Sequence, residues 1–340
     1  YLEGMGLWGP GTPFPNGFPQ FVSELSAGGI ATMELIAREL KANGKYIART
    51  ISFKGVTYAE HPYALNDGQK DLYRNAAKGW NVVTDRIEEA VKTVNGGKDA
   101  RTMFMNQFWS AHQRFFNLLV TALKTPAAID LAQKALDDGK SAVITLVNTN
   151  EAAQKRQEVK LKSQEEEDDA DDLDFGPKDI LLNLVKEHYP IQQWVDEVVI
   201  DGEGKEKKVK KPLTRKDENG KDVPVINPTA VAERDKLLGE LSASLHLPEN
   251  PLDIIINAFG RDNVAELTGR QKYYDPDKKK FINRGGDLPR NAVNVAAAKD
   301  FQQGKRRVAI LSQAAGTGIS LHAGNDVPNQ QKRVHITLQP

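Results

Sequence analysis

The stretch Val308-Ala-Ile-Leu-Ser-Gln-Ala-Ala-Gly-Thr-Gly-Ile-Ser-Leu321 decides the fold, because an apolar run leads directly into a glycine-rich loop. Short apolar runs of this kind are typical of strands that are buried on both faces of a parallel sheet. The glycines let the backbone approach a ligand closely, and the Thr between them adds a hydroxyl beside exposed N–H groups. The pattern predicts a strand followed by an anion-binding loop at the carboxyl end of the sheet. An ordinary strand-to-helix turn is the alternative.

Three similar apolar runs occur in the same part of the chain, and helical patterns lie between them. The runs cover residues 141–147, 263–267 and 333–338, and the helical patterns cover 251–259 and 293–301. Strands that alternate with helices predict an α/β domain with a parallel sheet and flanking helices.

The preceding region is helical in character. Three segments carry apolar residues at helical spacing, over 72–94, 103–123 and 127–136. Further upstream, a helical pattern ends at Asn43-Gly44, and β-branched and aromatic residues predict a strand pair over 46–58. We therefore divide the chain into three parts: residues 1–66, a helical connecting region at 67–138, and the α/β domain at 139–340.

A charged insertion at about 165–221 interrupts the α/β domain. Eight of the ten residues in 165–174 are acidic, and 202–221 holds eight Lys or Arg. Blocks of like charge repel one another and bury little apolar area, so we expect solvated loops there. The amphipathic stretch between them, at 177–199, is expected to dock as a helix.

The bulk composition excludes several classes of protein. Lys and Arg number 46, Asp and Glu also number 46, and there is no Cys. A uniformly basic coat, a disulfide framework and Cys-ligated zinc are thereby excluded. No stretch approaches the ~18 apolar residues of a membrane span, and the start of the chain has no signal-peptide pattern. We expect an intracellular protein with no membrane partner. Because the chain begins with Tyr1, we expect a processed protein or a fragment.

A second candidate site follows the predicted strand at 263–267. Thr268, Gly269 and Arg270 place a hydroxyl, a glycine and a cation at the end of this strand, a natural combination for phosphate. A surface turn is the alternative. The basic residues Lys278–Lys280 with Arg284 are candidates for the wall of a groove beside this site, and the lysines of 205–221 are either phosphate contacts or a solvated loop.

Several catalytic patterns are absent from the sequence. No G-x-x-x-x-G-K-[ST] phosphate loop, His-x-x-x-His pair or G-x-S-x-G nucleophile turn is present. We therefore assign no catalytic residue and no metal site to this chain.

The motifs taken together resemble the strawberry notch family of helicase-like proteins. The resemblance rests on the loop after Ile310, on Asn263-Val-Ala-Glu-Leu-Thr-Gly-Arg270, on residues 139–152, and on two front segments at 6–14 and 44–57. It implies a superfamily 2 helicase in which residues 1–66 are the tail of a first RecA-like domain and 139–340 form the second. The phosphate loop and acidic motif of such a helicase would precede Tyr1, and its arginine-finger motif would follow Pro340.

The resemblance also implies roles for individual residues. Nucleic-acid phosphates would contact Gly316, Thr317 and Gly318, with Thr268, Gly269 and Arg270 further along the backbone. Gly318 and Ser320 would face the nucleotide cleft. The complete protein would use ATP and Mg²⁺ to move on nucleic acid, DNA in preference to RNA, whereas this chain alone would not hydrolyse ATP.

Two other interpretations remain open. One is a non-catalytic nucleic-acid-binding protein built on a degenerate RecA-like half. The other is a protein-interaction scaffold that docks a partner at the acidic and helical insertion.

Overall fold

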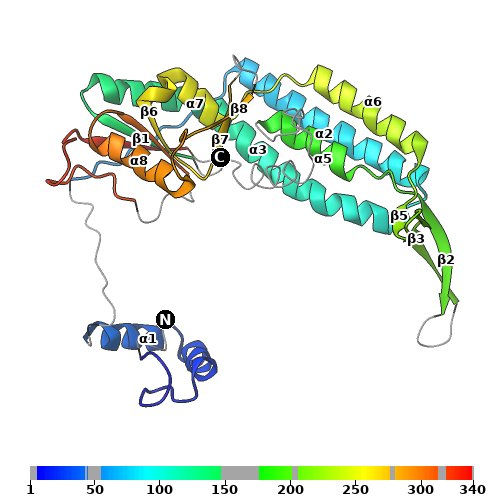
Figure 1. Ribbon diagram of the computed structural model, residues 1–340, viewed down its shortest axis with the longest axis horizontal. Coiled ribbons are helices and arrows are strands. Elements are labelled where there is room, and N and C mark those ends of the chain that lie inside the picture. Colours follow the sequence, from blue (N-terminus) through cyan, green and yellow to red (C-terminus); the bar gives the residue numbers. More distant parts are fainter. Residues whose placement is uncertain are drawn as a thin grey trace. The chain divides into compact units, whose positions relative to one another are not determined.

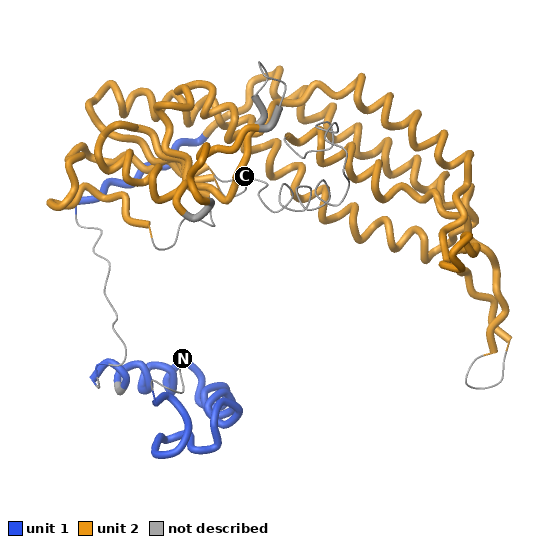
Figure 2. Tube along the Cα trace, viewed as in Figure 1, with its two compact units in different colours: residues 1–62 blue, residues 63–340 orange. Residues whose placement is uncertain are grey.

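The computed structural model describes residues 6–42, 44, 55–146, 176–200, 206–275, 280–312 and 319–338. The chain divides into two compact units, residues 1–62 and residues 63–340 (Figure 2). In the smaller unit, α1 (Phe18–Ala42) follows a loop in which Trp8 and Phe14 pack on Phe21 with ring centroids 5.2 and 5.1 Å apart. The helix ends directly before Asn43-Gly44, as the sequence predicts. Most of the strand pair predicted over 46–58 lies outside the described residues, and the described 56–58 form no strand.

Four helices of the larger unit enclose one hydrophobic cluster (Figure 1). They are α2 (Asp67–Thr93), α3 (Gly97–Asp137), α5 (Pro177–His188) and α6 (Pro228–Ser244). Asn66 caps α2 by accepting from the Gln69 backbone N–H, and the Gln69 side chain accepts from the Asn66 N–H in return. The apolar sides of the helices supply the core, which includes Trp80, Ile87, Phe104, Phe115, Leu181 and Leu237.

Helix α3 is continuous where the sequence predicts two helices. Pro126 lies inside it, and the preceding Thr125 donates its hydroxyl to the Thr121 carbonyl at 2.9 Å within the same turn. By length and composition alone, α3 is long and apolar enough to cross a membrane. This differs from the expectation that no stretch of the sequence approaches the ~18 apolar residues of a membrane span. Half of its most apolar window is buried within the described structure, however, and the core helix of a soluble protein gives the same pattern.

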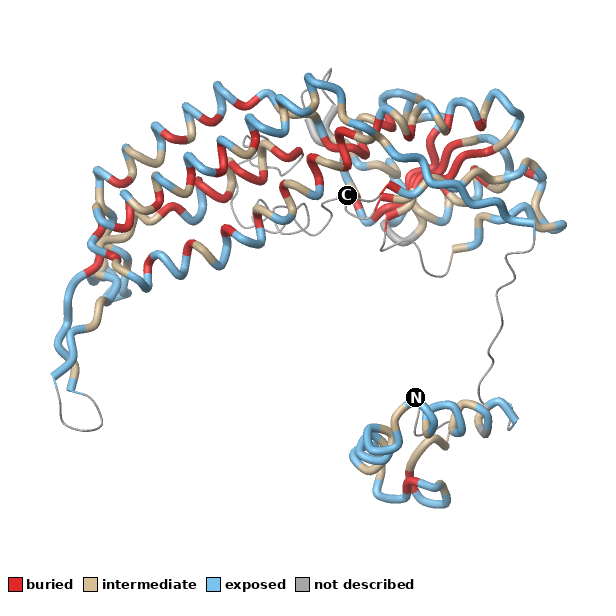
Figure 3. The backbone as a smooth tube through the Cα atoms, turned by 180° about the vertical axis from the view of Figure 1, so that it is seen from behind, coloured by how far each residue is buried: buried red, intermediate tan, exposed pale blue. Residues whose placement is uncertain are grey.

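The charged insertion contains more regular structure than the sequence predicts. The helix expected over 177–199 ends at His188, and β2 (Trp194–Ile200) follows it. β2 pairs antiparallel with β3 (Glu206–Pro212), so part of the expected basic loop is a strand. The register places Asp196 opposite Lys210, and an ion pair of 3.2 Å joins them. A shorter hairpin follows, formed by β4 (Thr214–Lys216) and β5 (Asp222–Pro224). Figure 3 shows that the β2–β3 hairpin is largely exposed, whereas the apolar side of α5 is buried in the bundle.

Four further strands form the parallel sheet that the sequence predicts. Its order is β10-β1-β9-β6. The strands are β1 (Ser141–Leu146), β6 (Val264–Leu267), β9 (Val308–Ser312) and β10 (Arg333–Leu338). Val308, Ala309 and Ile310 of β9 are buried, as expected for a strand inside a sheet with both faces covered.

Helices cover both faces of this sheet (Figure 1). The C-terminal part of α3 and α7 (Pro251–Phe259) pack with Ile144, Val264 and Ile310 on one face. On the other face α8 (Arg290–Gln302) contributes Phe301, which is fully buried. A third hairpin, β7 (Lys272–Asp275) with β8 (Lys280–Asn283), connects β6 to α8. This α/β arrangement is consistent with a RecA-like helicase C-terminal domain.

Candidate functional site

The two candidate loops leave the sheet from neighbouring strands. β6 and β9 pair in parallel, and Leu267 lies opposite Leu311 in the register. The turn that begins at Thr268 and the loop that follows Ser312 therefore start side by side at the carboxyl edge of the sheet, where open α/β sheets bind ligands. Gly316, Thr317 and Gly318 lie outside the described residues, so their assignment stays a prediction.

Thr268 is fully buried, and its hydroxyl has partners within the protein. The hydroxyl donates to Glu266 Oε1 at 2.7 Å and accepts from the Arg270 backbone N–H at 3.3 Å. Gly269 is the one exposed residue of the predicted Thr268–Arg270 trio. The Thr268 side chain therefore shapes the turn, and the surface of the turn is formed by the Gly269 backbone.

Arg270 is also buried, with 3% of its surface exposed. Its guanidinium contacts Glu266 twice, at 3.1 Å from both Nε and Nη2, and Nη1 donates to Asp253 on α7 at 2.6 Å. Burial opposes the charged form, but Glu266 and Asp253 outweigh it and raise the pKa of Arg270. In this structure the side chain joins β6 to α7, and its contact with a phosphate stays a prediction.

Glu266 lies at the centre of this group, which we call the Glu266 cluster: Asp253, Glu266, Thr268, Arg270, Arg284 and Asn294. An acidic residue in a buried strand is costly unless cations compensate it. Burial alone would raise the pKa of Glu266, but Arg270 and Arg284 outweigh it and hold the pKa below its ordinary value. Glu266 is therefore ionised at neutral pH.

Arg284 joins the cluster from beyond the turn, in a later part of the chain than Thr268 and Arg270. Its side chain is 6% exposed, and it donates to Glu266 Oε1 at 2.9 Å, to Thr268 Oγ1 at 2.9 Å and to the Arg270 carbonyl at 2.8 Å. Asn294 of α8 adds a donation to the Thr268 carbonyl at 2.9 Å. The sequence-based prediction was that Arg284 lines the wall of a groove beside this turn. In the structure, most of its side chain is buried within the cluster. The side chains of Lys278–Lys280 lie outside the described residues.

Two serines flank the glycine-rich loop. Ser312, the last residue of β9, is 3% exposed, and its Oγ has no hydrogen-bond partner among the described residues. Ser312 is not among the residues predicted for the site, although a hydroxyl at the end of an apolar strand is a signal that the sequence offers. Ser320, beyond the loop, is exposed, and its hydroxyl contacts His322 Nδ1. Its proposed contact with a nucleotide stays a prediction.

Two family models match the chain. Residues 250–340 match the C-terminal domain on strawberry notch homologue, and residues 1–75 match the P-loop containing NTP hydrolase pore-1 family. Together with the helix-flanked parallel sheet, these matches define the class: a helicase-like protein related to the P-loop NTP hydrolases.

Curated relatives narrow the class to one family. Protein strawberry notch homolog 1 of Rattus norvegicus is 28% identical, and the alignment covers all of this chain and 31% of that protein. Protein FORGETTER 1 of Arabidopsis thaliana is 28% identical, covering all of this chain and 34% of that protein. Protein strawberry notch of Drosophila melanogaster is 33% identical over 56% of this chain and 11% of its own length. The chain is thus similar over its whole length to proteins of the strawberry notch family.

The first relatives above are much longer than this chain, which spans about a third of their length. No solved structure matches the chain.

Proposed function

We propose that this chain is part of an ATP-dependent helicase or translocase of the strawberry notch type, to which it contributes nucleic-acid contacts and one wall of the nucleotide cleft. The observation that carries the proposal is the pairing of β6 with β9, which brings the Thr268 turn and Ser312, the residue before the glycine-rich loop, to the same edge of the sheet. Similarity to a helicase-like family supports it.

In this proposal, backbone groups hold the nucleic acid. The amides of Gly316 and Gly318 and the Thr317 hydroxyl donate to phosphate oxygens, and the exposed Gly269 backbone continues the track. The side chains of Thr268 and Arg270 stabilise the turn that carries Gly269, because they are hydrogen-bonded within the Glu266 cluster. Contacts of this kind position a strand without reading its sequence. We assign DNA in preference to RNA as the partner, in an intracellular setting.

The described residues do not fit ATP and Mg²⁺ by themselves. Phosphoryl transfer needs a phosphate cradle and an acidic residue that holds the metal. No group of three or more His, Cys, Asp or Glu that suits a metal occurs in the described part of the chain, and the sequence has no G-x-x-x-x-G-K-[ST] loop. We therefore assign ATP and Mg²⁺ to the complete protein, with Gly318 and Ser320 at the edge of the cleft.

Fluorescence anisotropy of labelled oligonucleotides tests the nucleic-acid contacts on this chain directly. We expect Thr317→Val to weaken binding to single-stranded DNA by about tenfold or more, since a hydrogen bond to a charged group contributes roughly 1.5–3 kcal/mol. Thr93→Val, at the partly exposed last residue of α2, is the matched control and should leave the affinity unchanged. Equal affinities for wild type and Thr317→Val would remove the loop from the interface.

A protein-interaction scaffold is a second candidate, favoured by the exposed apolar side chains of β2. Val198 is 53% exposed and Ile200 is 73% exposed. In a complete relative, Val198→Lys with Ile200→Lys should then abolish capture of a protein partner and leave nucleic-acid-stimulated ATPase unchanged. Loss of the ATPase would instead assign the hairpin to the motor.

A further inference from the structure

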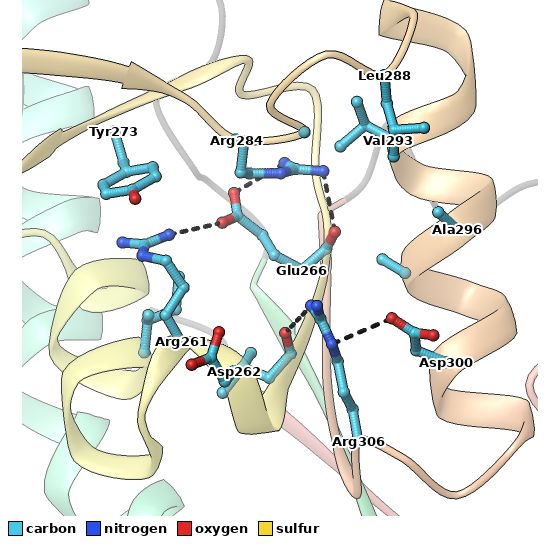
Figure 4. Close-up of a pocket in the computed structure, with 14 residues that line it drawn as sticks. Arg261, Asp262, Glu266, Tyr273, Arg284, Leu288, Val293, Ala296, Asp300 and Arg306 are labelled. Atoms are coloured by element: carbon cyan, nitrogen blue, oxygen red, sulfur yellow. Dashed lines mark hydrogen bonds and ion pairs between the residues drawn. The ribbon is translucent and has the colours of Figure 1, made fainter.

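A cavity of about 340 Å³ lies along the outer edge of β6 (Figure 4). One wall is formed by Glu266 of β6 and by Arg261 from the short 3-10 helix Arg261–Asn263. The opposite wall is α8 with the turn before it. Arg284 and Arg306 close the back of the cavity by donating to the carbonyls of Glu266 and Val264, at 3.0 and 2.9 Å.

Among the described residues, the ion pairs beside this cavity hold more arginines than carboxylates. Glu266 is shared by Arg270, Arg284 and Arg261, and Asp253 adds one further negative charge at Arg270. In these pairs of the described part of the chain, three guanidinium groups face two carboxylates. The remaining cation of the cavity, Arg306, has its own partner, because Asp300 lies 3.4 Å from its Nε. Asp262 also lines the cavity, but it is exposed, so water screens its charge.

Arg261 carries the surplus positive charge. Its Nη1 lies 3.7 Å from Glu266 Oε2, which is beyond hydrogen-bond distance, and this is its one ion pair among the described residues. Its guanidinium carbon lies 3.6 Å from the centre of the Tyr273 ring, which holds the planar group in place. Burial and the charge of Arg270 both lower the pKa of Arg261. The guanidinium therefore has donors free to bind an anion, and an anion would relieve the repulsion from Arg270.

The wall that faces Arg261 is apolar apart from Asp300, which pairs with Arg306. Leu288, Val293 and Ala296 line it, and Leu288 is 49% exposed at the cavity. Figure 4 shows these three side chains on the α8 side and the arginines on the β6 side. A ligand that fills the cavity would thus have a charged end and an apolar body.

We propose that this cavity binds a small organic anion. One carboxylate or phosphate group contacts Arg261, and an apolar or aromatic body packs on Leu288 and Val293. The site does not depend on the proposed helicase function, because it involves neither the glycine-rich loop nor a nucleotide.

Isothermal titration calorimetry on this chain tests the proposal with four probes: phenyl phosphate, benzoate, inorganic phosphate and benzyl alcohol. We expect at least one of the two aromatic anions to bind, and both inorganic phosphate and benzyl alcohol to bind at least about tenfold more weakly than it does. Arg261→Met keeps the apolar length of the side chain and should weaken the aromatic anion at least about tenfold. Ala296→Phe fills the cavity, keeps all the arginines and should have the same effect.

Arg101→Met is the matched control, because Arg101 pairs with Glu88 on the surface of the helical bundle. It should bind as the wild type does. Thermal melts of each variant confirm that the fold is retained. The proposal is overturned if neither aromatic anion binds to the wild type, if Arg261→Met or Ala296→Phe binds as tightly as the wild type, or if inorganic phosphate binds as tightly as phenyl phosphate.

Discussion

Arg284 bonds to both the side chain and the main chain of Glu266. Its Nη1 donates to the carboxylate Oε1 at 2.9 Å, and its Nη2 donates to the carbonyl at 3.0 Å. β6 is an edge strand of the described sheet, so this carbonyl has no neighbouring strand to pair with. Arg306 donates in the same way to the main-chain carbonyl of Val264. Side chains thus supply the hydrogen bonds that a further strand would supply, which also protects the edge from pairing with another chain.

Removing the charge of Glu266 should strongly destabilise the α/β domain. In Glu266→Gln the buried Arg270 and Arg284 lose their main counter-charge, and breaking a buried ion pair from one side costs about 3–5 kcal/mol. Urea unfolding followed by circular dichroism measures the effect. Glu88→Gln, which removes the exposed partner of Arg101, should change the free energy of unfolding by less than about 1 kcal/mol. If both variants lost the same free energy of unfolding, burial of the Glu266 ion pairs would not be the cause of their contribution to stability.

The contribution of Glu266 should depend on pH in a defined direction. Its pKa in the folded protein is below the ordinary 4.5, so folding favours the ionised form. Its stabilisation is fully present above pH 4.5 and is lost as the pH falls through the lower folded value. The difference in unfolding free energy between wild type and Glu266→Gln should therefore be constant from pH 7 to pH 5 and shrink in more acidic buffer. A difference that grows on acidification would reverse the assigned sign.

The bundle core should respond to aromatic truncation according to burial. Phe115 is fully buried beside Trp80, with ring centroids 5.2 Å apart, whereas Trp109 on the same helix is 58% exposed. Phe115→Ala should cost about 3–5 kcal/mol, because it removes a large side chain and leaves a cavity. Trp109→Ala should cost much less. Thermal unfolding of the two variants compares them directly, and similar melting temperatures would argue against the assigned packing.

In a complete relative that carries this segment, Thr317→Ala should lower nucleic-acid-stimulated ATPase and leave the basal rate unchanged. The stimulation, and not hydrolysis itself, is expected to pass through the loop. Steady-state ATPase with and without single-stranded DNA measures both rates. Full stimulation in the variant would contradict the role of the loop. Arg270→Ala is a poor probe of the same contact, because Arg270 holds Glu266 and Asp253 and its loss should reduce stability.

The sequence predicts the parallel sheet well because three of its strands, β1, β6 and β9, are short apolar runs that are almost wholly buried, and that pattern is local. The β2–β3 hairpin escaped prediction because its stabilising pairs, such as Asp196 with Lys210, join residues far apart in a charged segment. Charge density predicted a loop over β3, and the amphipathic pattern predicted a helix over most of β2.

Arg270 shows the same limit at the candidate site. A Thr-Gly-Arg turn after a strand is typical of phosphate contacts, yet the guanidinium faces inward. The decisive neighbour is Glu266, an acidic residue inside an otherwise apolar strand, and its partner Arg284 comes from beyond another hairpin. Local spacing does not show which buried carboxylate an arginine will meet.

Helix α3 has a mechanical consequence for the larger unit. It is about 60 Å long at roughly 1.5 Å per residue, and it contributes Phe115 to the bundle core and Ala132 to the sheet core. Because one rigid rod belongs to both cores, neither can come apart without pulling on the other. A force that acts on the bundle is transmitted along α3 to the sheet. Pro126 lies between the two cores and is the position where the helix bends first.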